Sequence, residues 1–112
     1  MGTRSAIGIM DGDVCRAVYC HWDGYLSNNG MILARYYRSA AKVQQLIELG
    51  DLSSLGEYIG EKHDFDDSSH NTWCKFYGRD RGEANTEARS FTNYDDFFKS
   101  YSGSGCEFFY IM

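Results

Sequence analysis

The sequence contains no proline and no long run of apolar residues. Without proline, slow X-Pro isomerisation cannot limit folding. A membrane-spanning helix needs about 18 consecutive apolar residues, and residues 1–9 also lack the apolar core of a signal peptide. We therefore expect neither a membrane span nor a membrane partner.

Several motifs that hold nucleotides, metals or activated nucleophiles are also missing. The chain has no G-x-G-x-x-G, no G-x-x-x-x-G-K-[ST] and no G-x-S-x-G pattern, so the common nucleotide and hydrolase sites are not expected. No two of its four cysteines form a C-x-x-C pair, so a structural zinc site is not expected. Because residues 1–9 do not form a signal peptide, we expect a cytosolic protein whose thiols are reduced. The sequence predicts no cofactor and no bound metal.

What the chain does contain is typical of one small folded domain spanning residues 1–112. Hydrophobic residues make up 43% of it and aromatic residues 16%, enough for a core and for aromatic contacts with a partner. The formal net charge of −5 comes from the second half of the chain. This charge argues against direct binding of nucleic acid.

The spacing of apolar residues predicts an α+β fold. Alternation predicts strands at residues 3–10, 14–22, 73–77, 87–91 and 106–112. Helical spacing predicts helices that end near residue 37, cover 40–49 after the cap residue Ser39, and begin after the cap residue Asn93. We expect an antiparallel sheet of four to five strands, with an N-terminal hairpin, a C-terminal strand and two to three helices packed on one face.

His21 and Asp23 form the first candidate for chemistry. Side chains two residues apart on a strand share a face, so Asp23 could orient His21 for proton transfer, whereas Cys20 points the other way. The competing interpretation is a half-buried histidine followed by a turn aspartate.

The charged segment at residues 79–83 is the second candidate. Arg79 and Arg81 carry guanidinium groups of the kind that bind phosphate or carboxylate, and Glu83 could complete an acid-base set with His21. The alternative is a solvated loop in which opposite charges pair with each other.

Residues 61–74 hold a third group of suitable side chains. Their types are typical of metal ligands, but their spacing matches no known metal motif, and a surface loop is the simpler interpretation. The residues concerned are His63, Asp64, Asp66, Asp67, His70 and Cys74.

The opening MGTRSAIGI, the segment YCHWDGY at residues 19–25 and the segments at 41–56 and 79–83 resemble a family of small uncharacterised proteins encoded by bacteriophages and mobile elements. The resemblance covers most of the chain and assigns no catalytic residue. It implies an accessory phage protein that acts in the host bacterial cytoplasm.

Composition and resemblance together predict a binding protein rather than an enzyme. We expect it to inhibit a host defence or nucleic-acid-processing complex, as an anti-CRISPR protein does, by covering that complex's basic nucleic-acid-binding surface with carboxylates and aromatic rings. The predicted contact residues are Glu61, Asp64, Asp66, Asp67, Asp95 and Asp96.

Two alternatives stay open. One is a small enzyme or ligand-binding module acting on a phosphate-bearing or nucleotide substrate, with His21, Asp23 and Glu83 as catalytic residues and Arg79 and Arg81 as phosphate ligands. The other is a homodimer formed through the open edge of the strand at residues 106–112.

Overall fold

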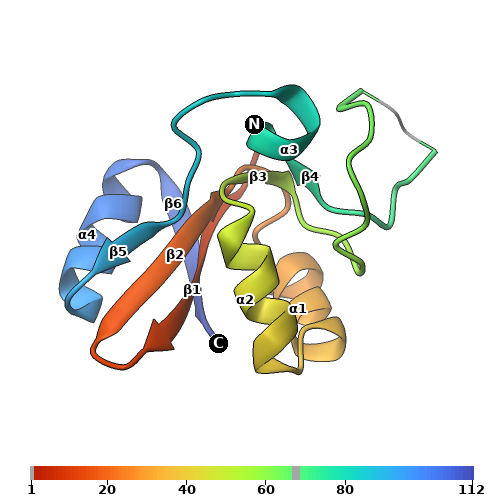
Figure 1. Ribbon diagram of the computed structural model, residues 1–112. Helices are drawn as coiled ribbons and strands as arrows, with labels where there is room; N and C mark the ends of the chain where they lie inside the picture. Colours follow the sequence, from red (N-terminus) through yellow and green to blue (C-terminus); the bar gives the residue numbers. More distant parts are fainter. Residues whose placement is uncertain (1, 67–68) are drawn as a thin grey trace.

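The computed structural model describes residues 2–66 and 69–112 of the chain. In chain order the elements are β1 (Arg4–Asp11), β2 (Val14–Cys20), the π-helical turn η1 (Leu26–Gly30), α1 (Met31–Tyr36), α2 (Ala40–Glu48), β3 (Leu52–Ser54), β4 (Lys75–Phe76), α3 (Tyr77–Arg81), β5 (Arg89–Phe91), α4 (Tyr94–Gly103) and β6 (Cys106–Ile111). Figure 1 shows them arranged around one twisted sheet. In the described part of the chain, no helix has the length and apolar character needed to cross a membrane.

The hairpin of β1 and β2 lies at the centre of the sheet. The two strands pair antiparallel over their whole length, and both are apolar on both faces. Ile7 and Val18 belong to the core on one side of the sheet, whereas Ala6 and Ala17 belong to the core on the other. This pattern follows from the alternation of side chains along a strand. The predicted N-terminal hairpin is confirmed.

The remaining strands extend the sheet in the order β4-β3-β2-β1-β6, and β5 pairs with the first half of β2. The α+β class and the C-terminal strand are confirmed, but the sheet is mixed rather than purely antiparallel. Strand β6 runs parallel to β1, and β3 runs parallel to β2. The helical connection from β2 to β3 carries the chain back along the sheet before it re-enters, which produces a parallel pair.

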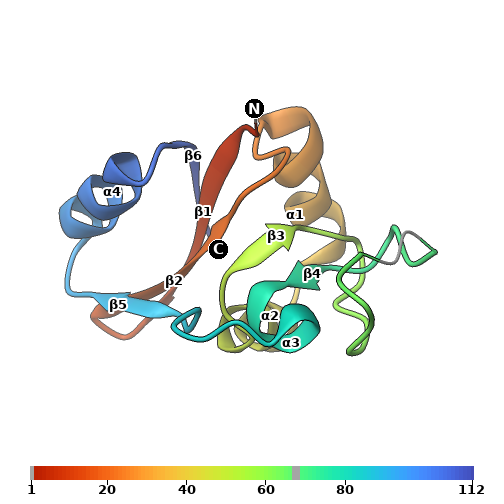
Figure 2. The ribbon, with the colours of Figure 1, turned by 90° about the horizontal axis from the view of Figure 1, so that it is seen from above.

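Helices cover both faces of the sheet, so the expectation that they pack on one face is corrected. Helices α1 and α2 lie on one side and α4 on the other, as the two views show (Figure 2). The physical reason lies in the hairpin, because two strands that are apolar on both faces need cover on both. Phe97 and Tyr101 of α4 supply the second cover and are buried.

Both predicted helix caps are present. The Ser39 hydroxyl accepts a hydrogen bond from the Lys42 amide at 3.2 Å, and the Asn93 side chain accepts one from the Asp96 amide at 2.9 Å. Each satisfies an amide that the first helical turn leaves unpaired. The starts of α2 and α4 are therefore decided locally.

The segment after β4 differs from its predicted structure. Residues 73–77 were expected as a strand and residues 78–83 as a charged loop, whereas β4 has only two residues and a short helix, α3, follows it at once. The buried Asp80 carboxylate accepts a hydrogen bond from the Phe76 amide at 2.9 Å and so ties the helix back to the strand. Gly82 then ends α3 in a left-handed conformation.

Gly50 and Gly82 give a matched test of how tightly the chain packs at the end of α2. Both have positive φ, of 89° and 70°, but a Cβ on Gly50 would lie 2.2 Å from the Thr86 carbonyl oxygen, whereas nothing lies within 4 Å of one on Gly82. We expect Gly82→Ala to lower the free energy of unfolding by about 1 kcal/mol, the strain of a left-handed alanine. Gly50→Ala should cost about 2 kcal/mol more, because backbone must also move. Urea denaturation of the two variants measures both, and equal losses would contradict this packing.

Candidate functional site

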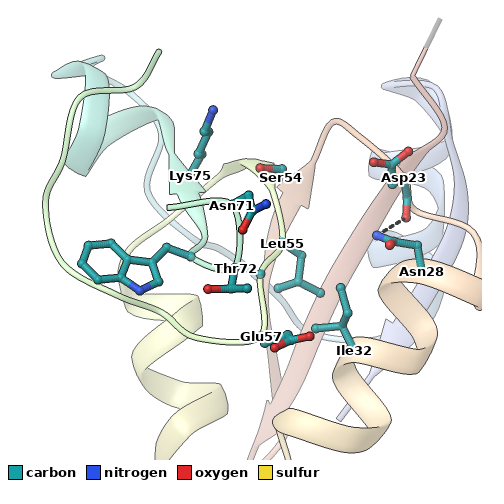
Figure 3. Close-up of a pocket in the computed structure, with 11 residues that line it drawn as sticks. Asp23, Asn28, Ile32, Ser54, Leu55, Glu57, Asn71, Thr72 and Lys75 are labelled. Atoms are coloured by element: carbon teal, nitrogen blue, oxygen red, sulfur yellow. Dashed lines mark hydrogen bonds between the residues drawn. The ribbon is translucent and has the colours of Figure 1, made fainter. Parts of the chain in front are cut away.

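A cleft opens where strands β2 and β3 end. Because the two strands run parallel, the segments that follow them leave the sheet at the same edge, which is where open sheets with parallel strands commonly bind ligands. The cleft has a volume of about 440 Å³. Figure 3 shows side chains that line it, and the full lining is Asp23, Asn28, Ile32, Ser54, Leu55, Gly56, Glu57, Asn71, Thr72, Trp73 and Lys75.

One wall is held by the turn after β2. Asp23 has a φ of 56°, and its carbonyl accepts hydrogen bonds from the Asn29 amide at 3.2 Å and the Asn28 side chain at 3.3 Å. The buried Asn29 side chain in turn donates to the Ser5 hydroxyl at 3.2 Å and to Cys20 Sγ at 3.4 Å. A strained turn persists only where its surroundings hold it, and these bonds to β1 and β2 fix the position of Asp23.

The opposite wall is fixed from the core side. Tyr37, which is buried at the end of α1, donates a hydrogen bond from its hydroxyl to the Gly56 carbonyl at 2.8 Å. The Gly56 amide donates to Cys74 Sγ at 3.2 Å. Burial raises the pKa of the Cys74 thiol, so this cysteine is a structural acceptor rather than a reactive thiolate.

Most polar side chains of the cleft have no partner among the residues that the structure describes. Among residues 2–66 and 69–112, no hydrogen bond or ion pair engages the side chains of Ser54, Glu57, Asn71, Thr72 or Lys75. Lys75 lies on one side of the cleft and Asp23 on the other (Figure 3). The cleft therefore presents donors and acceptors of both charges that the fold itself does not use.

A second, smaller cavity continues the cleft along α1. It has a volume of about 180 Å³ and shares Asn28, Ile32 and Glu57 with the first, so the two form one groove. Met31 and Tyr36 line this part and are 40% and 37% exposed. Tyr58 is 53% exposed, and its ring centroid lies 6.3 Å from that of Tyr36. These three side chains form the apolar rim of the groove.

The side chains of His21 and Asp23 form hydrogen bonds with other residues and not with each other. His21 Nδ1 shares a hydrogen bond of 2.8 Å with the Tyr19 hydroxyl, and its ring packs edge-on against Trp22 at 4.7 Å. Burial, and then the charge of Arg4, lower the pKa of His21. Within the described residues no hydrogen bond or ion pair links His21 to Asp23, Arg79 or Glu83, so the predicted acid-base set is not assembled.

The guanidinium group of Arg79 donates its hydrogen bonds to atoms of the protein itself. It donates from Nε and from one terminal nitrogen to the Asp80 carboxylate, at 2.9 and 3.2 Å. Its other N–H groups donate to the carbonyls of Ile59, Gly60 and Cys74. These bonds use all the donors of a guanidinium group, so the predicted phosphate contact of Arg79 is corrected.

Arg81 and Glu83 pair with each other on the surface, at 2.7 Å. The Arg81 guanidinium also lies over the rings of Phe65 and Tyr77. This matches the alternative in which charges of the 79–83 segment neutralise one another. An exposed pair of this kind adds little to stability.

The predicted acidic contact residues fall into two groups at opposite ends of the molecule. Glu61, Asp64 and Asp66 are exposed in the loop between β3 and β4, whereas Asp95 and Asp96 are exposed in the first turn of α4 (Figure 1). Asp67 lies outside the described residues.

No group of three histidine, cysteine, aspartate or glutamate side chains in the described residues is placed to hold a metal ion. All four cysteines are buried and free of disulfide bonds.

Comparison with known proteins adds no assignment, since no family model, curated protein or solved structure matches the chain. The phage-family resemblance therefore stays a prediction. The groove itself was not anticipated, because its lining comes from segments near residues 23–32, 54–57 and 71–75 that share no motif.

Asp80 offers a test of the bonds behind the groove. Burial alone would raise the pKa of Asp80, but hydrogen bonds from Arg79, Phe76 and His63 outweigh it and hold that pKa below its ordinary value. We expect Asp80→Asn to lower the free energy of unfolding at pH 7 by about 3 kcal/mol, because Arg79 keeps a buried charge without its partner. The deficit should be constant above the pKa of the unfolded carboxyl, about 4, and shrink as the pH falls through the lower, folded-state pKa.

Glu83→Gln is the matched control for this measurement. It also removes a carboxylate from an arginine pair, but on the surface, so we expect a loss below about 1 kcal/mol. Urea denaturation from pH 7 to pH 3 compares the variants. A loss for Asp80→Asn as small as that of the control would show that the Arg79–Asp80 pair does not anchor the site.

Proposed function

We propose that this protein binds an extended segment of a partner polypeptide in the groove. The observation that carries the proposal is the set of polar side chains in the cleft that have no partner among the described residues. Asn71 and Thr72 are exposed, and Ser54, Glu57 and Lys75 are half-buried, so these side chains are accessible to a partner. A partner backbone supplies both donors and acceptors and would satisfy amide, hydroxyl and charged side chains together.

The shape of the groove favours a chain over a compact molecule. The two cavities lie end to end along α1 and share residues, so an occupant can pass from the cleft between Asp23 and Lys75 to the rim at Tyr36. Extended peptides bind in this way, with backbone contacts giving affinity and side-chain pockets giving specificity.

The apolar rim supplies the anchoring contacts. Met31, Tyr36 and Tyr58 expose large surfaces beside the groove. Clustered exposed apolar side chains commonly mark interaction surfaces, and tyrosine contributes strongly to binding energy because it buries much area with few rotatable bonds. We expect the bound segment to carry a large apolar residue opposite this rim.

The charges in the groove refine the expected partner. Asp23 and Glu57 are acidic, and Lys75 and Arg35 are basic. A basic residue of the partner would meet carboxylates here, in line with the predicted attraction to a basic protein surface. Inhibition of a host complex is the biological consequence that the phage-family resemblance suggests for such binding.

The proposal is tested by panning a random dodecapeptide library against the immobilised protein and synthesising the enriched sequences. We expect enriched peptides with a large apolar residue and a basic residue a few positions apart, whose affinity is measured by fluorescence anisotropy of the labelled peptide. Asn71→Trp fills the cleft and should weaken binding at least about tenfold, or 1.4 kcal/mol.

Gln44→Trp is the control, since Gln44 is exposed on α2 and does not line the groove. It adds the same side chain and should leave peptide affinity unchanged. Enriched peptides that bind both variants equally well, or a library that yields no groove-dependent binder, would reject the peptide-binding function.

A further inference from the structure

A second polar cavity lies on the opposite side of the sheet from the groove. It has a volume of about 220 Å³ and is lined by Tyr19, Asp51, Arg89, Tyr101 and Ser104. Tyr19 and Tyr101 belong to the core beneath α4, whereas Leu55 and Ile32 of the groove belong to the core beneath α1 and α2. The sheet therefore separates the two sites.

Tyr101 carries an unsatisfied polar atom in this cavity wall. The residue is only 1% exposed, and its hydroxyl has no hydrogen-bond partner among the described residues. Buried hydroxyls are nearly always hydrogen-bonded in native proteins, so an orphan of this kind calls for an external partner. The neighbouring Asp51 charge and burial both raise the pKa of Tyr101, burial being the larger cause, so the hydroxyl keeps its proton and can donate it.

Asp51 and Arg89 carry opposite charges into the same cavity without pairing. Asp51 Oδ1 accepts a hydrogen bond from the Tyr19 amide at 2.9 Å, and its second oxygen has no partner in the described chain. The Arg89 guanidinium lies over the Tyr101 ring, 5.7 Å from its centroid, and makes no hydrogen bond or ion pair with any described residue. Burial raises the pKa of Asp51, which shows that its charge is poorly solvated where it stands.

The end of α4 adds a further polar contribution. The helix ends at Gly103, and Ser104 follows as its C-terminal cap. The C-terminal end of a helix carries partial negative charge and favours a cation, and here the Ser104 carbonyl already accepts a hydrogen bond from the Arg4 guanidinium at 3.2 Å. The negative charge that lines the cavity therefore comes from Asp51, and the positive charge comes from Arg89.

We propose that this cavity binds a small zwitterionic amino-carboxylate of the size of a free α-amino acid. The ligand carboxylate would accept hydrogen bonds from the guanidinium group of Arg89, whose fork geometry matches a carboxylate. The ligand ammonium would lie against Asp51, and the Tyr101 hydroxyl would gain its missing partner. A simple anion would face Asp51 and a simple amine would leave Arg89 unused, so both charges on one molecule are required.

The test is an NMR titration of the full chain with each standard amino acid, alongside acetate, methylammonium and inorganic phosphate as probes whose charge has only one sign. We expect at least one amino acid to shift the amide signals of Arg89 and Ser104 saturably, and acetate and methylammonium to do so at least about tenfold more weakly. Tyr101→Phe removes only the unpartnered hydroxyl. It should keep or raise the melting temperature while weakening the amino acid about fivefold, the worth of one hydrogen bond.

Tyr94→Phe is the matched control, because it removes the same atom from an exposed position of the same helix, and its affinity should equal that of the unaltered protein. Asp51→Asn should weaken the amino acid more than it weakens acetate. Several outcomes would overturn the proposal: no saturable shift with any amino acid, binding of acetate or phosphate as strong as that of the amino acid, or binding unchanged by Tyr101→Phe. The groove lies across the sheet, so these results are independent of peptide binding there.

Discussion

The two-sided hairpin of β1 and β2 is the constraint on which the rest of the structure depends. Its strands are apolar on both faces, so the sheet cannot leave either face to water, and one layer of helices is not sufficient. The α1–α2 pair closes one side and α4 closes the other. After α1 and α2 the chain returns as β3, parallel to β2, and after α4 it returns as β6, parallel to β1. The mixed sheet is thus a consequence of covering both faces of this hairpin with helices.

The same constraint places the groove. The helical crossover from β2 to β3 makes these strands parallel, so the turn at Asp23 and the segment after Ser54 emerge side by side. Several hydrogen bonds and one buried ion pair hold the walls of the groove in place. Asn29, Tyr37 and the Arg79–Asp80 pair are all engaged within the protein. Other polar side chains that line the cleft have no partner among the described residues, and these are Ser54, Glu57, Asn71, Thr72 and Lys75.

Burial on both faces also explains why the molecule has polar cavities on two sides. One cavity lies where α4 ends, and Asp51 and Arg89 line it together with Tyr101. Where α1 begins, the groove opens in the same manner on the other face. In each case residues from several neighbouring elements line the recess.

Local features of this protein could be read from the sequence, because they depend on residues close together in the chain. The alternation of the hairpin, the caps at Ser39 and Asn93 and the apolar stripe of α4 are of this kind. The role of Arg79 and the composition of the groove were decided only by tertiary structure. The sequence does not show whether the N–H groups of an arginine donate to carbonyls of distant segments or to water. Only the packing that brings residues 59, 74 and 79 together decided which of these is true here.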